Sequence, residues 1–146
     1  MKHALGRTLL TAVLTIWLTT SAWAEFDEGM AAYESGDYAS ALEEFLPVAE
    51  QGLASAQTIL GAMYHHGQGV PQDYIQAVKW YRLAAEQGEA YAQFILGDMY
   101  ERGEGVPQDY AEALKWYRLA AEQGTFVTLT ASGKTQAVAL SFCQTT

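Results

Sequence analysis

The hexapeptide Gly-Val-Pro-Gln-Asp-Tyr occurs at residues 69–74 and again, 36 positions later, at residues 105–110. Pro71 cannot continue a helix, and it pushes the residue before it out of the helical region, so the first half of the hexapeptide is a turn. Asp73 is a favoured helix N-cap, with Gln76 three residues on as in a capping box, so the second half starts a helix. The hexapeptide therefore predicts a turn between two helices, used twice.

The hexapeptide is part of a longer internal repeat. A shift of 36 aligns residues 53–88 with residues 89–124, and 26 of the 36 positions are identical. A third copy at residues 26–52 is shorter and lacks five residues of the internal loop. A period of this length is typical of helical repeat arrays. We therefore divide residues 25–124 into three units, called here units one, two and three.

Each full unit is predicted to form two antiparallel helices. In unit two, apolar residues recur at helical spacing over residues 54–66 and again over residues 74–87. Gly67 follows the first helix, where a left-handed residue is favoured, and Gly88 follows the second. Helices this short are marginal alone, and one hairpin cannot bury both its faces. The sequence therefore predicts an all-α fold, a short α-solenoid of about three stacked helix pairs with a period of 36 residues.

The repeated residues resemble the signature of the Sel-like repeat, a relative of the tetratricopeptide repeat. The matching residues are Ala56, Leu60, Gly61, Tyr64, Gly67, Gly69, Val70, Asp73, Ala77, Trp80, Ala84, Ala85 and Gly88, and each recurs 36 positions later. The resemblance covers two full units and part of the first. Every matched residue is architectural, so the resemblance implies a shape before it implies a function.

Two segments depart from the repeat. Pro47 lies inside the second helix of unit one, where we expect a bend or an early stop, with residues 48–51 continuing after it. The tail at residues 125–146 is rich in threonine and almost uncharged. Within it, residues 126–129 favour a strand, and residues 135–142 favour a short helix capped by Ser132. Two interpretations of the tail stay open: a cap over the last unit, or a poorly ordered segment left by an altered reading frame.

The N-terminus has the features of a secretory signal. Lys2 and Arg7 precede an apolar run of ten residues at 9–18, and Ala22 and Ala24 place small residues where a signal peptidase cuts. That run is shorter than the roughly 20 residues that span a bilayer. We expect cleavage of residues 1–24 and a periplasmic or secreted protein of bacterial type, without stable membrane insertion after cleavage. An uncleaved anchor is the alternative.

Charge and cysteine content narrow the choice of partners. Cleavage would remove two cations and no acid, which takes the net charge from −9 to −11. An acidic chain is repelled by phosphate backbones, so a nucleic-acid partner is not expected, and there is no basic patch for anionic lipid. Cys143 is the only cysteine, so no internal disulfide can form. Stability must come from packing.

The candidate binding site is the face on which units two and three differ. The differing pairs fall at helical spacing on the first helix of each unit. They are Ser55/Tyr91, Thr58/Phe94, Ala62/Asp98, His65/Glu101 and His66/Arg102. In the related tetratricopeptide fold the matching face lines a concave groove that holds peptides or partner helices. The hypothesis is a protein or peptide site, richest at Tyr91, Phe94, Asp98, Glu101 and Arg102, and continued by Ser55, Thr58, Ala62 and His65. The alternative is that Tyr91 and Phe94 pack against a neighbouring unit.

The sequence predicts no enzyme, cofactor or metal site. It contains no Ser-x-x-Lys, His-Glu-x-x-His or Gly-x-Ser-x-Gly motif. His65 and His66 are adjacent on a helix and point in different directions, with no further ligand evident. Trp80 and Trp116 are interpreted as core residues instead of a stacking platform for bases or sugars.

Three alternatives to a binding scaffold stand beside it. Some cysteine-rich relatives of this repeat have been described as penicillin-binding or β-lactamase-like, although those carry a disulfide in each repeat and this chain does not. The second alternative is a truncated repeat protein with little function. The third is self-association through the uncapped C-terminal end.

Overall fold

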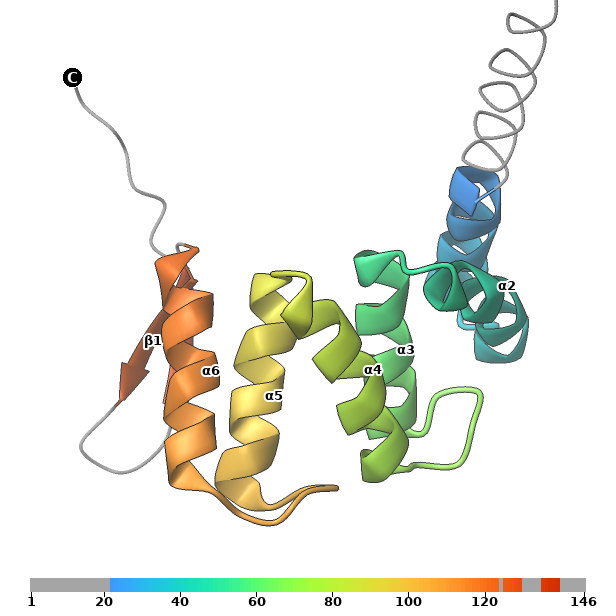
Figure 1. The fold of residues 1–146 in the computed structure, drawn as a ribbon. Helices are drawn as coiled ribbons and strands as arrows, with labels where there is room; N and C mark the ends of the chain where they lie inside the picture. The colour runs from blue at the N-terminus through green and yellow to red at the C-terminus, as the bar shows by residue number, and fades with distance from the viewer. Residues whose placement is uncertain (1–21, 124, 130–134, 140–146) are drawn as a thin grey trace, which may run out of the picture.

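Figure 1 shows the computed structural model, which describes residues 22–123, 125–129 and 135–139. A helix runs through residues 22–35, and five further helices follow in the order of the chain. They are α2 (Tyr38–Glu50), α3 (Ala54–His66), α4 (Tyr74–Glu86), α5 (Ala90–Arg102) and α6 (Tyr110–Glu122). The prediction of three helix pairs is confirmed. The predicted signal peptide lies outside the described residues except for residues 22–24, which are helical.

Each helix packs against the next along the chain, both within a unit and across the junction between units. The two hydrophobic clusters lie mainly at these junctions. One joins Phe45 and Val48 of α2 to Leu60 and Met63 of α3. The other joins α4 of unit two to α5 and α6 of unit three. Burial of apolar surface between neighbouring units therefore supplies much of the stability, as expected for a solenoid.

Within each full unit a large aromatic ring packs on a glycine of the facing helix. The Tyr81 ring of α4 lies over Gly61 of α3, where an added Cβ would be 2.8 Å from Cδ1 of the ring. Gly97 has the same relation to Tyr117. The glycine lets the two helix axes approach closely, and the ring fills the space that remains. The sequence repeats this pair because the geometry of the hairpin repeats.

The turn of each full unit contacts the unit before it. Gly105 adopts a φ of +71°, and a Cβ added there would overlap the carbonyl of Tyr74 at the start of α4. Gly69 has a φ of +73° and lies in the same way on the carbonyl of Tyr38. Positive φ and close approach both require glycine. The Gly-x-Gly turn therefore docks one unit on the next as well as reversing the chain.

The predicted N-caps are present. The Asp73 carboxylate accepts hydrogen bonds from the backbone N–H groups of Ile75 (2.9 Å) and Gln76 (3.0 Å). Asp109 caps α6 in the same way. The reciprocal bond of a capping box is replaced, because the backbone N–H of Asp73 donates to the carbonyl of Tyr64 at 2.9 Å. That bond ties the end of the turn back to α3.

A buried glutamine in each full unit forms one hydrogen bond to the unit before it and one to a second glutamine of its own unit. The buried Gln93 side chain donates to the carbonyl of Ala85 at 3.0 Å, and its oxygen accepts from Gln123 at 3.2 Å. In the preceding unit Gln57 donates to Ala49 at 3.0 Å and accepts from Gln87 at 2.7 Å, which repeats the arrangement. A buried amide must satisfy its hydrogen bonds, so these glutamines fix the register between units.

Replacing Gln93 with methionine keeps the length of the side chain and removes both hydrogen bonds. We expect the free energy of unfolding to fall by about 1 kcal/mol, the usual net value of such bonds. Urea unfolding followed by far-UV circular dichroism measures the change. Gln51→Met is the matched control, because Gln51 is exposed, and its effect should stay within about 0.5 kcal/mol. Equal effects of the two substitutions would contradict the proposed role of Gln93.

Two expectations about departures from the repeat need correction. Strand β1 (Thr125–Leu129) is present as expected, but residues 135–139 form strand β2 (Thr135–Ala139) and not part of a helix. β2 pairs antiparallel with β1, and threonine and valine favour such a strand. β1 contacts α6 and α5. Ser132 and residues 140–146 lie outside the described residues, and a capping role for the whole tail stays a prediction.

Of the two outcomes expected at Pro47, a bend or an early stop, the early stop is wrong. α2 continues through Pro47 to Glu50. Pro47 is exposed, whereas Val48 and Ala49 are buried in the cluster at the junction with unit two. Tertiary packing of these two residues therefore holds the last turn of the helix. None of the helices in the described part of the chain has the length and apolar character needed to span a bilayer.

Candidate functional site

The predicted binding face lies on α3 and α5, the first helices of units two and three. Tyr91 is 54% exposed near the start of α5, and Ser55 is exposed at the corresponding place on α3. Arg102 is exposed at the end of α5. These three side chains are accessible to a partner. The remaining predicted residues are at least partly engaged within the protein.

Phe94 packs within its own unit. Its ring centroid lies 5.6 Å from that of Tyr117 on α6, with the two planes at 40°, and the side chain is half-buried. On α3 the corresponding Thr58 is also half-buried and donates from its hydroxyl to the carbonyl of Ala54 at 2.9 Å. The aromatic ring that Phe94 contacts therefore belongs to its own hairpin.

The second half of α5 carries a cluster of charged side chains. Nε of Arg102 lies 3.1 Å from a carboxylate oxygen of Asp98, one helical turn away. The hydroxyl of Tyr117 donates to the carboxylate of Glu101 at 2.7 Å. Burial raises the pKa of the Asp98 carboxyl, which the neighbouring Arg102 guanidinium opposes. The cluster is therefore acidic on balance, with one exposed cation beside it.

His65 lies at the junction of units two and three. Its Nε2 is 3.3 Å from the carboxylate of Glu104, which belongs to the turn of unit three. The centroid of its ring lies 5.2 Å from the centroid of the Tyr74 ring. Its buried Nδ1 has no hydrogen-bond partner. Among the predicted residues, Ala62 is also half-buried and packs against the core cluster. His65 and Ala62 therefore belong to the interface between units more than to an open groove.

Metal coordination finds no support among the described residues. No group of three or more histidine, cysteine, aspartate or glutamate side chains there is placed to hold a metal ion. The ring centroids of His65 and His66 lie 4.7 Å apart, with the ring planes at 85° in an edge-to-face contact. Trp116 is a core residue as predicted and is 8% exposed within one cluster, whereas Trp80 is partly buried and packs against the other cluster.

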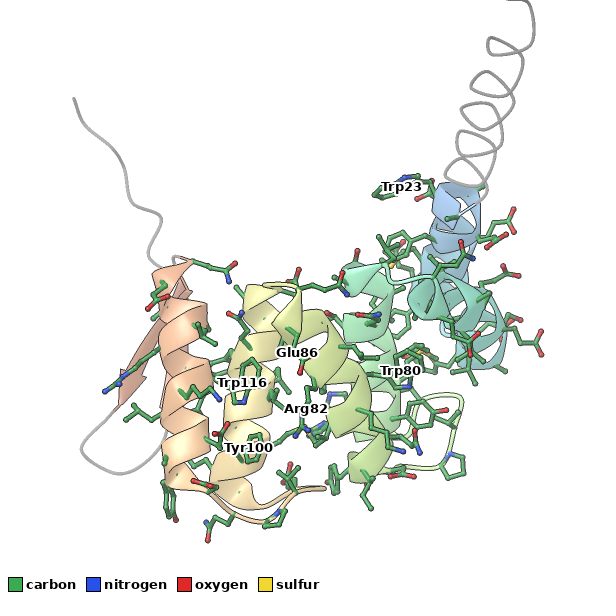
Figure 2. All side chains as sticks on the ribbon, in the orientation of Figure 1. Trp23, Trp80, Arg82, Glu86, Tyr100 and Trp116 are labelled. Carbon is green, nitrogen blue, oxygen red and sulfur yellow. The ribbon has the colours of Figure 1, made fainter. Side chains whose placement is uncertain are left out.

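Sequence reasoning missed the side-chain contacts that cross between units. Arg82 of α4 donates to the hydroxyl of Tyr100 on α5, and its guanidinium lies 5.9 Å from the centre of that ring. Figure 2 shows the two side chains meeting between the helices. Tyr33 donates to Gln68 at 2.9 Å across the preceding junction. One signal in the sequence could have indicated the junction with unit three. Between units two and three, His65 is replaced by Glu101 and Gln68 by Glu104, so both positions change together.

The raised pKa of Asp98 has a measurable consequence. The folded state holds the proton more tightly than the unfolded state, whose carboxyl has an ordinary pKa near 3.8. The unfolded state therefore binds fewer protons between these two values, and stability falls as the pH rises through that window. We expect Asp98→Asn to remove this fall. The stability of the variant relative to the parent protein should therefore increase as the pH rises above 3.8. Thermal unfolding at several pH values measures it.

A second variant checks the cause. Arg102→Gln removes the cation that lowers the pKa of Asp98. The fall in stability with rising pH should then extend to higher pH than in the parent protein. If both variants give the pH profile of the parent, Asp98 is not the group responsible.

The fold and the site place the chain among helical-hairpin solenoids of the tetratricopeptide type. The family model of the Sel1 repeat matches residues 54–89 and 90–125. The chain is a member of the Sel-like repeat family. Proteins with Sel1 repeats are generally scaffolds for protein–protein interaction and are generally not enzymes.

Solved structures agree with this assignment. A Sel1 repeat protein from Oxalobacter formigenes is 42% identical, with a TM-score of 0.63 over 66% of this chain and 40% of its own length. A protective antigen of uropathogenic Escherichia coli that displays an SLR fold is 44% identical, with a TM-score of 0.68 over 79% of this chain and 26% of its own. This chain thus spans less than half the length of either protein. No curated protein matches the sequence.

The fold extends to a cysteine-rich relative. Cysteine-rich protein B of Helicobacter pylori is 24% identical, with a TM-score of 0.56 over 58% of this chain and 64% of its own. At that identity the likeness is one of fold. The helix pairs of this chain therefore form the same kind of solenoid with a single cysteine in the whole sequence.

Proposed function

We propose that the protein is an exported scaffold that binds a protein or peptide partner on the exposed face of α3 and α5. The family supports a role in protein–protein interaction, and this chain adds a particular surface to it. The partner docks on that surface and supplies any chemistry that follows. The solenoid acts as a stiff scaffold that presents this surface to the partner.

The observation that carries the proposal is the exposure of the Tyr91 side chain. It is 54% exposed on α5, whereas Tyr81 and Tyr117 of the two full units are buried against their glycines. An exposed tyrosine offers a large contact area and a hydroxyl at a small entropic cost, which is why tyrosine is enriched among binding hot spots. Ser55 on the neighbouring first helix holds the corresponding position, so the two side chains mark one line across the repeats.

The contacts on this face set the extent of the site. Tyr91, Ser55 and Arg102 are exposed. Glu101 and Phe94 are held by Tyr117. Their role is to shape the surface and to carry its negative charge. The partner that fits this arrangement best presents an apolar surface to the Tyr91 ring and a basic group to the acidic end of α5.

Photocrosslinking tests the site. A photoreactive phenylalanine analogue at position 91 should crosslink a discrete partner in the cell envelope, and the same analogue at position 75 should not. Ile75 is the matched control because it is 59% exposed on α4, away from the proposed face. Tyr91→Ala should abolish capture of that partner from the envelope while leaving the far-UV circular dichroism unchanged. If position 75 yields the same crosslinks as position 91, or if Tyr91→Ala unfolds the protein, the proposed site is wrong.

Export has its own test. Residues 1–24 have the features of a cleaved signal, so mature protein recovered from the periplasm or medium of a bacterial host should begin at Glu25. Mass spectrometry of the intact protein measures this directly. A cytoplasmic product that retains Met1 would contradict the export part of the proposal and leave the binding face untouched.

A further inference from the structure

A second surface lies at the C-terminal end of the solenoid. A groove of about 180 Å³ runs between the second half of α5 and the first half of α6. It is lined by Glu101, Tyr110, Ala113, Leu114 and Tyr117. Strand β1 contacts both helices, yet Leu114 remains 40% exposed and Tyr110 66% exposed. The groove shares Glu101 with the face proposed above, but it lies at the opposite end of α5 from the exposed Tyr91.

The same five positions occur in unit two, where three of them are buried and two are partly buried. The residues 36 positions earlier are His65, Tyr74, Ala77, Val78 and Tyr81. Val78, the counterpart of Leu114, is only 5% exposed because it belongs to the cluster that α4 forms with unit three. Among the described residues, this surface therefore has its occupant in place in unit two and keeps an open groove in unit three.

The occupied copy defines the shape of what the groove accepts. At the junction of units two and three, the backbone of Gly105 lies on the carbonyl of Tyr74, which is the counterpart of Tyr110. The side chain of Glu104 reaches His65, which is the counterpart of Glu101. Gly69 docks on Tyr38 in the same way at the preceding junction. The occupant is a helix followed by a Gly-x-Gly turn.

We propose that this groove binds the first helix and glycine turn of a Sel1-type repeat carried by another polypeptide, with lysine or arginine at the position of Glu104. The charge of the groove selects the basic residue. Where unit two presents His65 to an acidic turn, unit three presents Glu101, with Asp98 and Glu104 nearby on the same unit. A glutamate in the incoming turn would be repelled, whereas a cation is attracted.

A second copy of this chain fits the groove poorly. Its unit-three turn carries Glu104, which already contacts His65 and would face Glu101 with like charge. Its unit-two turn carries Gln68, which is engaged by Tyr33 of its own unit one. Unit one lacks five residues of the turn altogether. The partner is therefore a different repeat protein.

Two synthetic peptides serve as probes. The first has the natural sequence of residues 89–109, the second carries the single change Glu104→Lys, and a side-chain lactam keeps both helical. Fluorescence anisotropy measures their binding to the full-length protein. We expect the substituted peptide to bind about three- to tenfold tighter at low salt, since an exposed charge pair contributes little more than that. The difference should shrink at high salt because ions screen exposed charges.

Matched variants of the protein locate the binding. Leu114→Lys should weaken binding of the substituted peptide about tenfold or more, because it places a cation in the groove. Leu83→Lys should leave binding unchanged, since Leu83 is similarly exposed (46%) but lies on α4 outside the groove. Tyr91→Ala should also leave it unchanged, which separates this site from the proposed function.

Several results would overturn the proposal. They are the absence of binding by either peptide, equal affinity for both, and binding that Leu114→Lys does not affect. A fourth result comes from sedimentation of the protein alone. If the protein self-associates and Leu114→Lys abolishes that self-association, the occupant of the groove is a second copy of this chain.

Discussion

Replacing Gly105 with alanine is expected to lower the free energy of unfolding by about 2–4 kcal/mol, because two physical terms add. The φ of +71° disfavours any residue with a Cβ by about 1 kcal/mol or more, and the new methyl group overlaps the Tyr74 carbonyl, where overpacking costs roughly 1–3 kcal/mol. The backbone carbonyl cannot move aside as a flexible side chain would, so unit three must shift away from unit two. Urea unfolding measures the loss.

The matched control is Gly36→Ala. Gly36 has a φ of +83°, but no atom lies within 4 Å of a Cβ built there. Gly36→Ala therefore has only the cost of placing a Cβ at a positive φ. The free energy of unfolding is expected to fall by about 1 kcal/mol. The difference between the two variants isolates the contact between units. If both substitutions lose the same free energy, the turn of unit three does not dock on α4 as described.

Replacing Tyr81 with alanine is expected to lower the free energy of unfolding by about 3–5 kcal/mol. Tyr81 is a large, fully buried side chain, and its ring lies on Gly61. The substitution removes a buried aromatic ring and leaves a cavity between α3 and α4, which is among the most damaging changes a core can receive. Tyr110→Ala is the control, since Tyr110 is 66% exposed, and should change stability by no more than about 0.5 kcal/mol.

The pair gives a sharper test through a change of sign. In the parent protein Gly61→Ala should destabilise by about 1–3 kcal/mol, because the methyl group meets the Tyr81 ring. In the Tyr81→Ala background the ring is gone, and alanine is better than glycine inside a helix by about 1 kcal/mol, so the same substitution should stabilise. A double-mutant cycle measures both values. Additive effects would show that the ring and the glycine are not in contact.

The sequence alone was sufficient for the helices because the local signals are strong and repeated. Asp73 and Asp109 mark helix starts, the glycines after α3 and α5 mark helix ends, and the 36-residue period requires stacking. Prediction failed where tertiary contacts override local preference. Pro47 breaks isolated helices, but the buried residues after it keep α2 intact. Residues 135–139 have an ambiguous local pattern, and pairing with β1 decides for a strand.

The site was harder to predict than the fold. Sequence comparison between units identified the variable face of α3 and α5, because differences between copies of a repeat concentrate where the framework does not constrain them. It did not separate exposed from engaged side chains on that face. Tyr91 and Phe94 look equivalent in sequence, yet the first is exposed and the second packs on Tyr117. That distinction depends on the contact that Phe94 makes with Tyr117 of α6, which the pattern within α5 does not contain.

Native-state hydrogen exchange tests most directly the claim that the core of this protein lies between its repeats. In the parent protein the amides of Val78 and Tyr81 on α4 and of Leu96 on α5 should share high protection, because they belong to one buried cluster. Gly105→Ala should lower the protection of all three together, although Val78 and Tyr81 belong to a different unit from the substitution. If α4 keeps its protection while only unit three loses it, the repeats fold independently and the account is contradicted.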